Sequence, residues 1–429
     1  MATAALTHID AIKAKTHQKI LELVDLRRME SMSPSQLRSE LKLLTERLLD
    51  DDGIAINESE RRTVVQSIQH EMLGLGPIEP LLADITVSDI LVNGPNRVYV
   101  ERRGCLEITD VKFDSDAHLL RIIDKIVSHI GRRVDELSPM VDARMPDGSR
   151  VNAIIPPLAI DGPVLSIRRF SVVPYGMDDL VNHGTLTTEM AELIHGLVKA
   201  KVNLLISGGT GSGKTTLLNV ISGAIPSNER IITIEDAAEL QMQQPHVVRL
   251  ESRPQNIEGK GEVTERALLR NSLRMRPDRI ILGEIRGPEV LDMLQAMNTG
   301  HEGSMSTIHA NTPRDALTRL EHMMSMAGMQ VTPRAMRQQI SAALSVVIQI
   351  SRLSDGKRKI TSLQEITGIE GDILSMQEIF KFDQTGVDAS GAVQGRFLAT
   401  GIRPKFEQRL RTRGVKLRET LYDTTRNRD

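Results

Sequence analysis

Residues 204–216 read LLISGGTGSGKTT, and the rest of the chain is organised around this stretch. The apolar residues 202–206 predict a strand that leads into it, and residues 217–221 predict a helix that follows it. Glycines between a strand and a helix let successive backbone N–H groups turn inward beside a positive helix N-terminus. We therefore expect a nucleoside triphosphate site, with a glycine-rich turn made for packing alone as the alternative.

Each position of this loop has an expected task. Lys214 reaches the β- and γ-phosphates in such loops, the Thr215 hydroxyl is a ligand of Mg²⁺, and Thr216 lies near the α-phosphate. ATP and Mg²⁺ are accordingly the expected ligands. The full set of expected nucleotide-binding residues is Gly208, Gly209, Thr210, Gly211, Ser212, Gly213, Lys214, Thr215 and Thr216.

Composition sets the broad class of the protein. A chain of 429 residues is long enough for two or three domains, and its net charge of −2 offers no general attraction to nucleic acid or anionic lipid. Its 1 cysteine, Cys105, excludes an internal disulfide and a four-cysteine zinc site, and we expect it in a half-buried strand. No apolar run approaches the roughly 18 residues of a membrane span, and no signal-peptide core is present. The expected location is the cytoplasm.

Composition and apolar periodicity change along the chain and divide it into segments. We expect a helical N-terminal segment (1–56), a smaller α/β domain (57–170), an interdomain linker (171–186) and a larger α/β domain (187–429). Leu37, Leu41, Leu44 and Leu48 lie at helical spacing, so their face packs on the chain behind it or, alternatively, binds a partner.

Periodicity indicates the elements of the two α/β domains. In the first, strands are expected at 90–92, 97–101, 106–108, 140–145, 150–155 and 164–169, with a helix after Ser115. In the second, strands at 230–234, 247–250, 279–282 and 304–308 alternate with helices at 187–199, 264–275, 288–297 and 313–326. That alternation predicts a doubly wound sheet. Residues 346–382 predict antiparallel strands, and the basic tail 403–418 predicts a solvated surface or a docking segment.

Acidic side chains follow two of the apolar strands. Glu235, Asp236 and Glu239 come at the end of the first, where carboxylates beside a phosphate loop can orient water or Mg²⁺ ligands. Glu284 ends the strand 279–282, as the acid of a Walker B element does, and can polarise the attacking water or bind Mg²⁺. Acids at strand ends also occur as solvated caps, which is the alternative for the first group.

Two histidines bracket the strand at 304–308. His301 precedes it and His309 follows it, so either imidazole could sense a γ-phosphate or serve a structural purpose.

Arginines cluster just before the linker, at positions 144, 150, 168 and 169. Phosphoryl transfer needs cations at the developing charge, and an arginine supplied by another domain or subunit contributes about 10³–10⁵ in rate. Ordinary surface ion pairing is the competing interpretation for these side chains.

Four boxes in this order resemble the superfamily of secretion ATPases that power type II and type IV secretion and type IV pili. They are GGTGSGKTT (208–216), TIEDAAEL (233–240), RMRPDRIILGEIRGPE (274–289) and TGHEGSMSTIHANT (299–312). The resemblance extends upstream through LGPIEPLL (75–82), SDILVNGPNRVYVE (88–101) and DARMPDGSRVNAIIPP (142–157). Residues 296–321 and the closing ATGIRPKF (399–406) are similar to the CpaF-type subgroup, the assembly ATPases of Flp/Tad pili.

The resemblance implies a fold and a site. The fold would be an α/β N-terminal domain hinged to a RecA-like P-loop ATPase domain, assembled as a hexameric ring with ATP between the two domains. Among the residues that match the family's functional positions, Arg150 and Arg168 would act against the phosphates, with Arg169 and Arg144 as further candidates. The acidic-box glutamates are Glu235 and Glu239, and the Walker B acid is Glu284. The histidine-box residues are His301 and His309. The general secretion-pathway and pilus-extension ATPases often carry a four-cysteine zinc insertion, which a chain with 1 cysteine cannot form. That favours the Flp/Tad or type IV secretion branches, and no zinc is expected.

The function expected from these features is a Mg²⁺-dependent ATPase motor that assembles, or assembles and retracts, a Flp/Tad pilus. It would attach peripherally to the inner membrane through platform proteins. A type IV secretion ATPase moving protein or DNA is the alternative within the superfamily. A non-hydrolysing nucleotide switch is a second rival, and a nucleic-acid motor a third. We do not expect nucleic acid as a partner, because the chain has no Trp, 3 Tyr and 6 Phe for base stacking.

Overall fold

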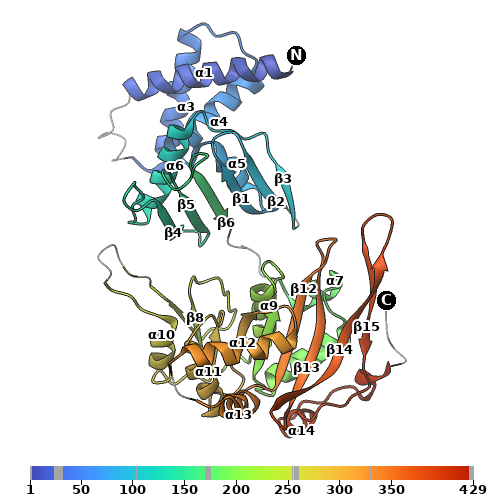
Figure 1. The fold of residues 1–429 in the computed structure, drawn as a ribbon. Helices are drawn as coiled ribbons and strands as arrows, with labels where there is room; N and C mark the ends of the chain where they lie inside the picture. The colour runs from blue at the N-terminus through green and yellow to red at the C-terminus, as the bar shows by residue number, and fades with distance from the viewer. Residues whose placement is uncertain are drawn as a thin grey trace. The chain divides into compact units, whose positions relative to one another are not determined.

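The computed structural model describes residues 2–23, 32–102, 104–169, 175–253, 255, 260–328 and 331–424. The chain forms two compact units, Met1–Phe170 and Ser171–Asp429, and each has hydrophobic cores of its own (Figure 1). Of the expected linker, residues 171–174 lie outside the described residues, whereas Met177–Asn182 form a short helix, α7, that belongs to the second unit.

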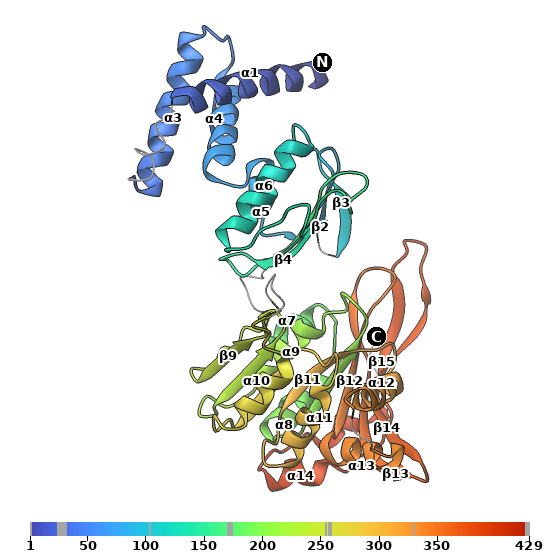
Figure 2. The ribbon, with the colours of Figure 1, turned by 60° about the vertical axis from the view of Figure 1, so that its left-hand side comes forward.

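Three helices open the first unit: α1 (Ala2–Leu23), α3 (Pro34–Asp51) and α4 (Glu58–Leu73). Helices α3 and α4 each begin with a capping box, at Ser33 and Asn57, which satisfies backbone N–H groups of the first turn. Helix α1 lies across the other two (Figure 2). Leu41 and Leu48 are buried in their shared core, so the packing interpretation of the leucine face is confirmed. Helix α4 shares that core too, although residue 57 was the expected start of the sheet domain.

A six-stranded antiparallel sheet forms the rest of the first unit, in the order β3-β2-β1-β6-β5-β4. Its strands are β1 (Val87–Asn93), β2 (Val98–Arg102), β3 (Cys105–Ile108), β4 (Met140–Arg144), β5 (Arg150–Ile154) and β6 (Val164–Arg168). The turn η1 (Gly76–Ile78) and α5 (Glu79–Ala83) precede it, and α6 (Asp116–His129), capped by Ser115, covers its apolar face. Cys105 is exposed rather than half-buried, because β3 is an edge strand.

The second unit is built on a nine-stranded sheet in the order β15-β14-β13-β12-β7-β11-β10-β8-β9. Its central strands are β7 (Leu204–Gly208), β8 (Ile231–Glu235), β9 (Val247–Glu251), β10 (Arg279–Leu282), β11 (Met305–His309) and β12 (Val346–Arg352), all mutually parallel. Strand β12 is parallel to β7, so it belongs to the central sheet, whereas the sequence predicted only antiparallel pairing there. The α/β, RecA-like fold class is confirmed.

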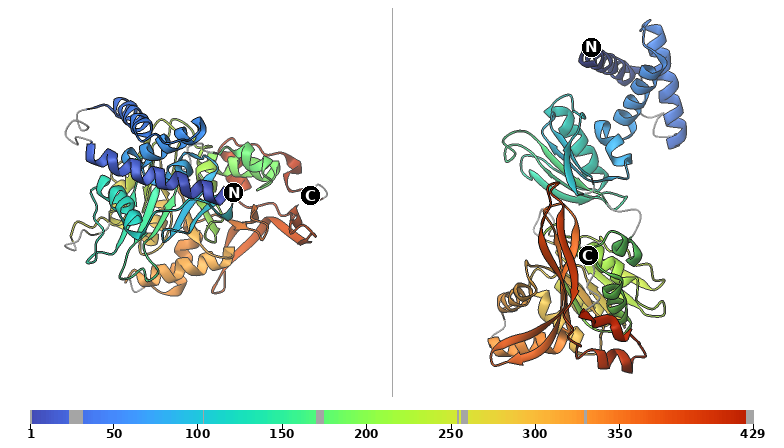
Figure 3. Two further views of the ribbon diagram at one scale, coloured as in Figure 1. Left: turned by 90° about the horizontal axis from the view of Figure 1, so that it is seen from above. Right: turned by 90° about the vertical axis from the view of Figure 1, so that its right-hand side faces the viewer.

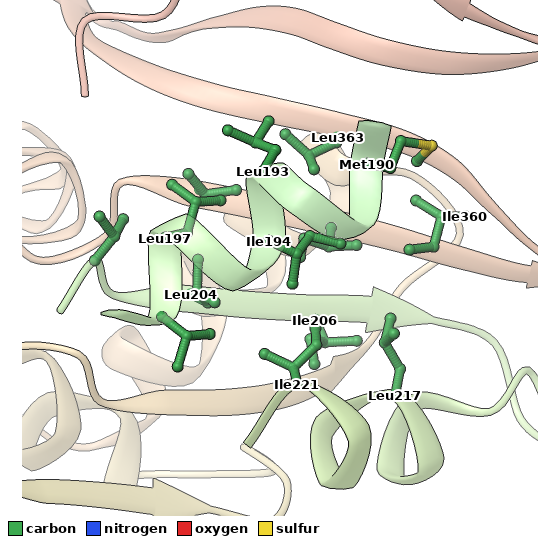
Figure 4. Packing of buried hydrophobic residues seen from close by; sticks show 14 of the residues in the cluster. Met190, Leu193, Ile194, Leu197, Leu204, Ile206, Leu217, Ile221, Ile360 and Leu363 are labelled. Atoms are coloured by element: carbon green, nitrogen blue, oxygen red, sulfur yellow. The ribbon is translucent and has the colours of Figure 1, made fainter. Parts of the chain in front are cut away.

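Helices cover both faces of this sheet, because its central strands are apolar on both faces. On one face lie α8 (Thr188–Lys199) and α9 (Lys214–Ser222), whose apolar side chains meet β7 and β13 (Figure 4). On the other lie α10 (Glu265–Ser272), α11 (Glu289–Asn298), α12 (Pro313–Met326) and α13 (Pro333–Ala343). The two-sided covering agrees with the doubly wound prediction.

The C-terminal part extends the sheet with the antiparallel strands β13 (Arg358–Glu370), β14 (Ile373–Val387) and β15 (Val393–Ala399). Strands β14 and β15 form a long twisted hairpin (Figure 3). The basic tail then folds back as α14 (Glu407–Thr412) and η2 (Glu419–Tyr422).

The basic tail is a packed segment, which corrects the solvated-surface interpretation. Leu410 is fully buried against α8, and the Arg409 guanidinium donates to the backbone oxygens of Ala200 (3.3 Å) and Lys201 (2.6 Å). Because charged residues dominate this stretch, its few apolar residues gave no sequence pattern that predicts burial.

None of the helices in the described part of the chain is long and apolar enough to cross a membrane.

Candidate nucleotide site

The phosphate loop connects the buried strand β7 to α9, as predicted. Gly211 (φ 68°) and Gly213 (φ 97°) occupy left-handed backbone conformations that other residues rarely adopt, and Gly213 caps α9. A Cβ at Gly208 would lie 2.4 Å from the backbone oxygen of Ile350, so this position has no room for a side chain. Thr215 is half-buried in the first turn of α9, whereas Thr216 is exposed.

Lys214 folds back over the loop. Its ammonium donates to the backbone oxygen of Gly209 at 2.9 Å and lies 3.3 Å from His309 Nδ1. Burial lowers the pKa of Lys214, and the negative charge of Glu284 opposes that effect. The cation is therefore held at the loop by one carbonyl and one imidazole, two contacts that an incoming phosphate can replace.

His309 joins the phosphate loop to the Walker B strand. Strand β11 runs parallel to β7 with His309 opposite Gly208, so both residues emerge at the same edge of the sheet. The Nε2 atom of His309 lies 3.1 Å from Glu284 Oε1. Burial lowers the pKa of His309, although Glu284 counteracts it, and a single neutral tautomer satisfies both contacts: Nε2–H donates to Glu284 and Nδ1 accepts from Lys214.

Glu284 has a second partner that the sequence reasoning missed. The Arg286 guanidinium donates to Glu284 Oε2 at 3.0 Å and to Asp236 Oδ2 at 2.8 Å. The backbone N–H groups of Arg286 and Gly287 both donate to Glu289 at 2.6 Å, which fixes the turn that carries Arg286. The motif GEIRG places an arginine two residues after the acid, and that spacing was the available signal.

The chain Lys214–His309–Glu284–Arg286, which we call the site relay, thus links the phosphate loop to the acidic box. A further arginine, Arg319 on α12, adds to the effect of burial, because its positive charge also lowers the pKa of Lys214 and of His309. Arg319 lies within the stretch 296–321 that resembles the CpaF-type subgroup, but the sequence analysis assigned it no role.

Glu235 is the most buried carboxylate of the predicted set, with an exposed fraction of 2%. Its Oε2 accepts from the backbone N–H groups of Glu239 (2.7 Å) and Leu240 (2.8 Å), whereas Oε1 has no hydrogen-bond partner among the described residues. Burial raises the pKa of Glu235 to about 7, and the two backbone hydrogen bonds moderate the rise. Asp236 is exposed and Glu239 is half-buried.

His301 lies away from the phosphate loop of its own chain. It precedes β11 at the end where β7 begins, whereas the phosphate loop follows the end where β7 finishes. Its Nδ1 lies 3.2 Å from the backbone oxygen of Pro277. The two box histidines therefore lie at opposite ends of β11, as the sequence predicted, and a role for His301 at a γ-phosphate stays a prediction.

The predicted arginines occupy one row of the N-terminal sheet. Arg144 pairs in register with Arg150, and Arg150 with Arg168. Arg168 Nε also lies 3.1 Å from Asp89 Oδ1. Arg169 departs from the row, because its guanidinium donates to the backbone oxygens of Asp84 and Val87. These contacts hold the Arg169 guanidinium against the backbone of the first unit.

The donor set suits Mg²⁺ rather than a transition metal. Thr215 offers a hydroxyl, Glu284 a carboxylate, and Glu235 a buried carboxylate oxygen without a partner among the described residues. Within the described ranges no group of three or more His, Cys, Asp or Glu side chains could form a protein-only metal centre. Mg²⁺ beside a nucleotide is usually bound through one or two protein oxygens together with phosphates and water.

Comparison with protein families shows which family the chain belongs to. A family described as Type II/IV secretion system protein matches residues 71–403, which include both α/β regions and every predicted site residue. The chain belongs to this family. It is an ATP hydrolase of the RecA-like kind found there, and its expected place among secretion ATPases is confirmed at the level of the superfamily.

Two of the similar proteins are described as conjugal transfer proteins. The putative conjugal transfer protein Rv3659c of Mycobacterium tuberculosis is 36% identical over 324 residues, covering 74% of this chain and 92% of that protein. The conjugal transfer protein TrbB of Rhizobium radiobacter is 33% identical over 294 residues, covering 68% of this chain and 86% of that protein.

Solved structures include the VirB11 ATPase of Brucella suis in complex with sulphate. It is 27% identical and has a TM-score of 0.37, with 67% of this chain and 94% of that chain covered. The pilus retraction motor PilT with bound ADP is 17% identical with a TM-score of 0.48, covering 77% and 84%.

Proposed function

We propose that this secretion ATPase works as a Mg²⁺-dependent hexameric motor that assembles a Flp/Tad pilus at the inner membrane. The observation that carries the ATPase part of the proposal is the site relay, which connects the cation of the phosphate loop to the acid of the Walker B strand through the His309 imidazole. A loop that only stored nucleotide would not need its lysine connected to a carboxylate suited to polarising water.

Nucleotide binding starts with an exchange at Lys214. The ammonium gives up its hydrogen bond to the Gly209 oxygen and binds the β- and γ-phosphates. The backbone N–H groups of residues 208–213 donate hydrogen bonds to the same phosphates. Mg²⁺, held by Thr215 and Glu284, would neutralise part of the phosphate charge. The departure of Lys214 removes one of the two contacts that hold His309, so that imidazole becomes free to contact the γ-phosphate.

Hydrolysis depends on the acids of the site. Glu284, oriented by His309 and Arg286, accepts a hydrogen bond from the attacking water and polarises it. Glu235 and Glu239 orient the water and the ligands of the metal from the neighbouring strand end. Once the γ-phosphate has left, His309 returns to its bridge between Lys214 and Glu284.

Arg150 and Arg168 serve in this proposal as the cations that the N-terminal unit brings to the phosphates. Arg150 on β5 and Arg168 on β6 are register partners on neighbouring strands, so both guanidinium groups start from the same part of one sheet. Loss of the γ-phosphate removes their attraction to the nucleotide, so the two units separate and the stroke is produced. Arg144 is the next candidate along the same row.

The alternative function is a type IV secretion ATPase that moves protein or DNA, and a specific observation favours it: relatives at 33–36% identity are described as conjugal transfer proteins. The Flp/Tad assignment is supported instead by similarity of residues 296–321 and 399–406 to the CpaF-type subgroup. In both cases the ring would be cytoplasmic and attached to inner-membrane platform proteins.

A complementation experiment tests the proposal. A strain lacking the gene receives the wild type or Glu284→Gln, and surface pili are counted by electron microscopy while conjugation and protein secretion are measured in the same cells. The proposal predicts that only the wild type restores pili. If the wild type restored conjugation or secretion but not pili, the alternative function would replace the proposed one.

A further inference from the structure

A hairpin outside the sequence motifs reaches the phosphate loop. Strand β12 pairs with β7 up to Gln349 and Ser207, and its last residues, 350–352, continue alongside the loop. Strand β13 returns antiparallel, with Arg358 opposite Arg352. The two strands therefore place two guanidinium groups together beside the loop; we call them the hairpin arginines.

Both hairpin arginines approach the glycines of the loop. Arg358 Nε donates to the backbone oxygen of Gly211 at 3.1 Å. A Cβ built on Gly213 would lie 3.1 Å from Arg358 Cδ, and one built on Gly211 would lie 3.7 Å from Arg352 Nη1. The absence of side chains at these glycines thus leaves the space that the hairpin fills.

The charge of the hairpin arginines is not neutralised by a described carboxylate. The one acid in their turn, Asp355, is engaged elsewhere: its oxygens accept from the Lys357 N–H (3.1 Å) and the Val393 N–H (3.1 Å), and the Lys357 ammonium lies 3.5 Å away. Among the described residues, neither Arg352 nor Arg358 takes part in an ion pair. An anion at the loop would supply that missing counter-charge.

The order of the strands indicates which phosphate of a bound nucleotide would lie near the β12–β13 hairpin. Strands β12 and β11 flank β7 on opposite sides. His309 and Glu284 stand on the β11 side, where the proposed function puts cleavage of the γ-phosphate, so in that function the β12 side is the side of the α-phosphate and the nucleoside. The hairpin arginines are therefore remote from the bond that breaks.

We propose that Arg352 binds the α-phosphate of the nucleotide and that Arg358 is a positioning residue that holds the phosphate loop through the Gly211 oxygen. This inference rests on the proposed function, because it assumes a nucleoside triphosphate in the loop. Since ATP and ADP share the α-phosphate, the contact strengthens binding of both and changes the chemical step little.

The experiment measures ATP turnover and ADP binding by purified full-length protein. For Arg352→Ala we expect KM for ATP and Kd for ADP to rise by about tenfold or more, the usual effect of losing a charge-assisted hydrogen bond, while kcat stays within about twofold. Arg352→Lys should recover much of the affinity. Arg358→Ala should weaken ADP binding and leave the melting temperature of the nucleotide-free protein unchanged.

Lys357→Ala is the matched control, because Lys357 is an exposed cation in the same turn whose ammonium pairs with Asp355. The control should keep wild-type KM and Kd; an equal loss in this variant would show general electrostatics and overturn the assignment. A fall in kcat at constant KM for Arg352→Ala, or unchanged affinity, would also overturn it. If the wild type itself bound no ATP, the proposed function would fail instead.

Discussion

At the scale of single residues, the site depends on burial as much as on charge. Glu235 and Glu284 both follow apolar strands, yet Glu284 is paired with His309 and Arg286, whereas Glu235 is enclosed and receives only backbone N–H groups. Two carboxylates of one site therefore stand in different surroundings, which is how a site assigns different tasks to like groups.

The proton on Glu235 makes stability depend on pH. Burial raises its pKa to about 7 in the fold against an ordinary value of 4.5, so between these pH values the folded protein binds more protons than the unfolded chain. Stability contributed by this group is consequently lost as pH rises from about 4.5 toward 7.

Glu235→Gln should therefore change stability little at pH 5 and stabilise the nucleotide-free protein at pH 8, by about 1–3 kcal/mol, because it removes a buried charge and keeps a carbonyl for the two N–H groups. Urea unfolding of both proteins at each pH measures the difference. A stabilisation that is equal at the two pH values would show that Glu235 does not titrate in this range.

Sequence reasoning found the residues of the site that belong to motifs. Lys214, Glu284 and His309 were predicted and are in contact through the site relay. His301 and His309 were predicted to bracket one strand and do so, and His309 is the one of the two that contacts Lys214 of the phosphate loop. Arg352 was missed, because its approach to the loop depends on the pairing of β12 with β7, and no local pattern encodes which strands become neighbours.

At the scale of elements, the fold was predicted where periodicity was strong. Strand β10 and helix α12 have the bounds that the sequence indicated. Helix α13 and strand β15 were missed, since both lie in segments where polar residues interrupt the apolar pattern. The C-terminal tail illustrates the same limit, because its arginines obscured the buried Phe406 and Leu410.

The tail should contribute to the stability of the ATPase unit. Leu410 is fully buried and packs beside Gly196, so Leu410→Ala should lower the free energy of unfolding by about 2–5 kcal/mol through lost contacts and a cavity. Ile373→Ala is the control, because that side chain is 61% exposed in the same unit and should cost little. Equal effects in chemical denaturation would mean that the tail is not packed.

At the scale of the whole molecule, the proposed mechanism couples two units through a nucleotide. The second unit carries the loop, the site relay and the hairpin arginines, and the first carries the arginine row at 144, 150 and 168. In the proposed mechanism, the arginine row of the first unit acts on phosphate held by the loop of the second unit.

Arg150→Ala and Arg168→Ala should each lower kcat for ATP by about 10³-fold or more, as loss of an arginine supplied to a transferring phosphoryl group does. Arg133→Ala is the matched control, because its side chain is exposed and paired only with Asp135 among the contacts described for it. Steady-state ATP turnover by the purified full-length protein measures all three. Wild-type rates in both variants would remove the N-terminal unit from the chemistry.

The most direct test of the mechanism is one comparison of ATP binding and ATP turnover in wild type and Glu284→Gln. Because Lys214 and the loop remain intact while the water loses its polarising carboxylate, we expect the variant to bind ATP as the wild type does and to turn it over at least about 10²-fold more slowly. Turnover at the wild-type rate in Glu284→Gln would contradict the mechanism.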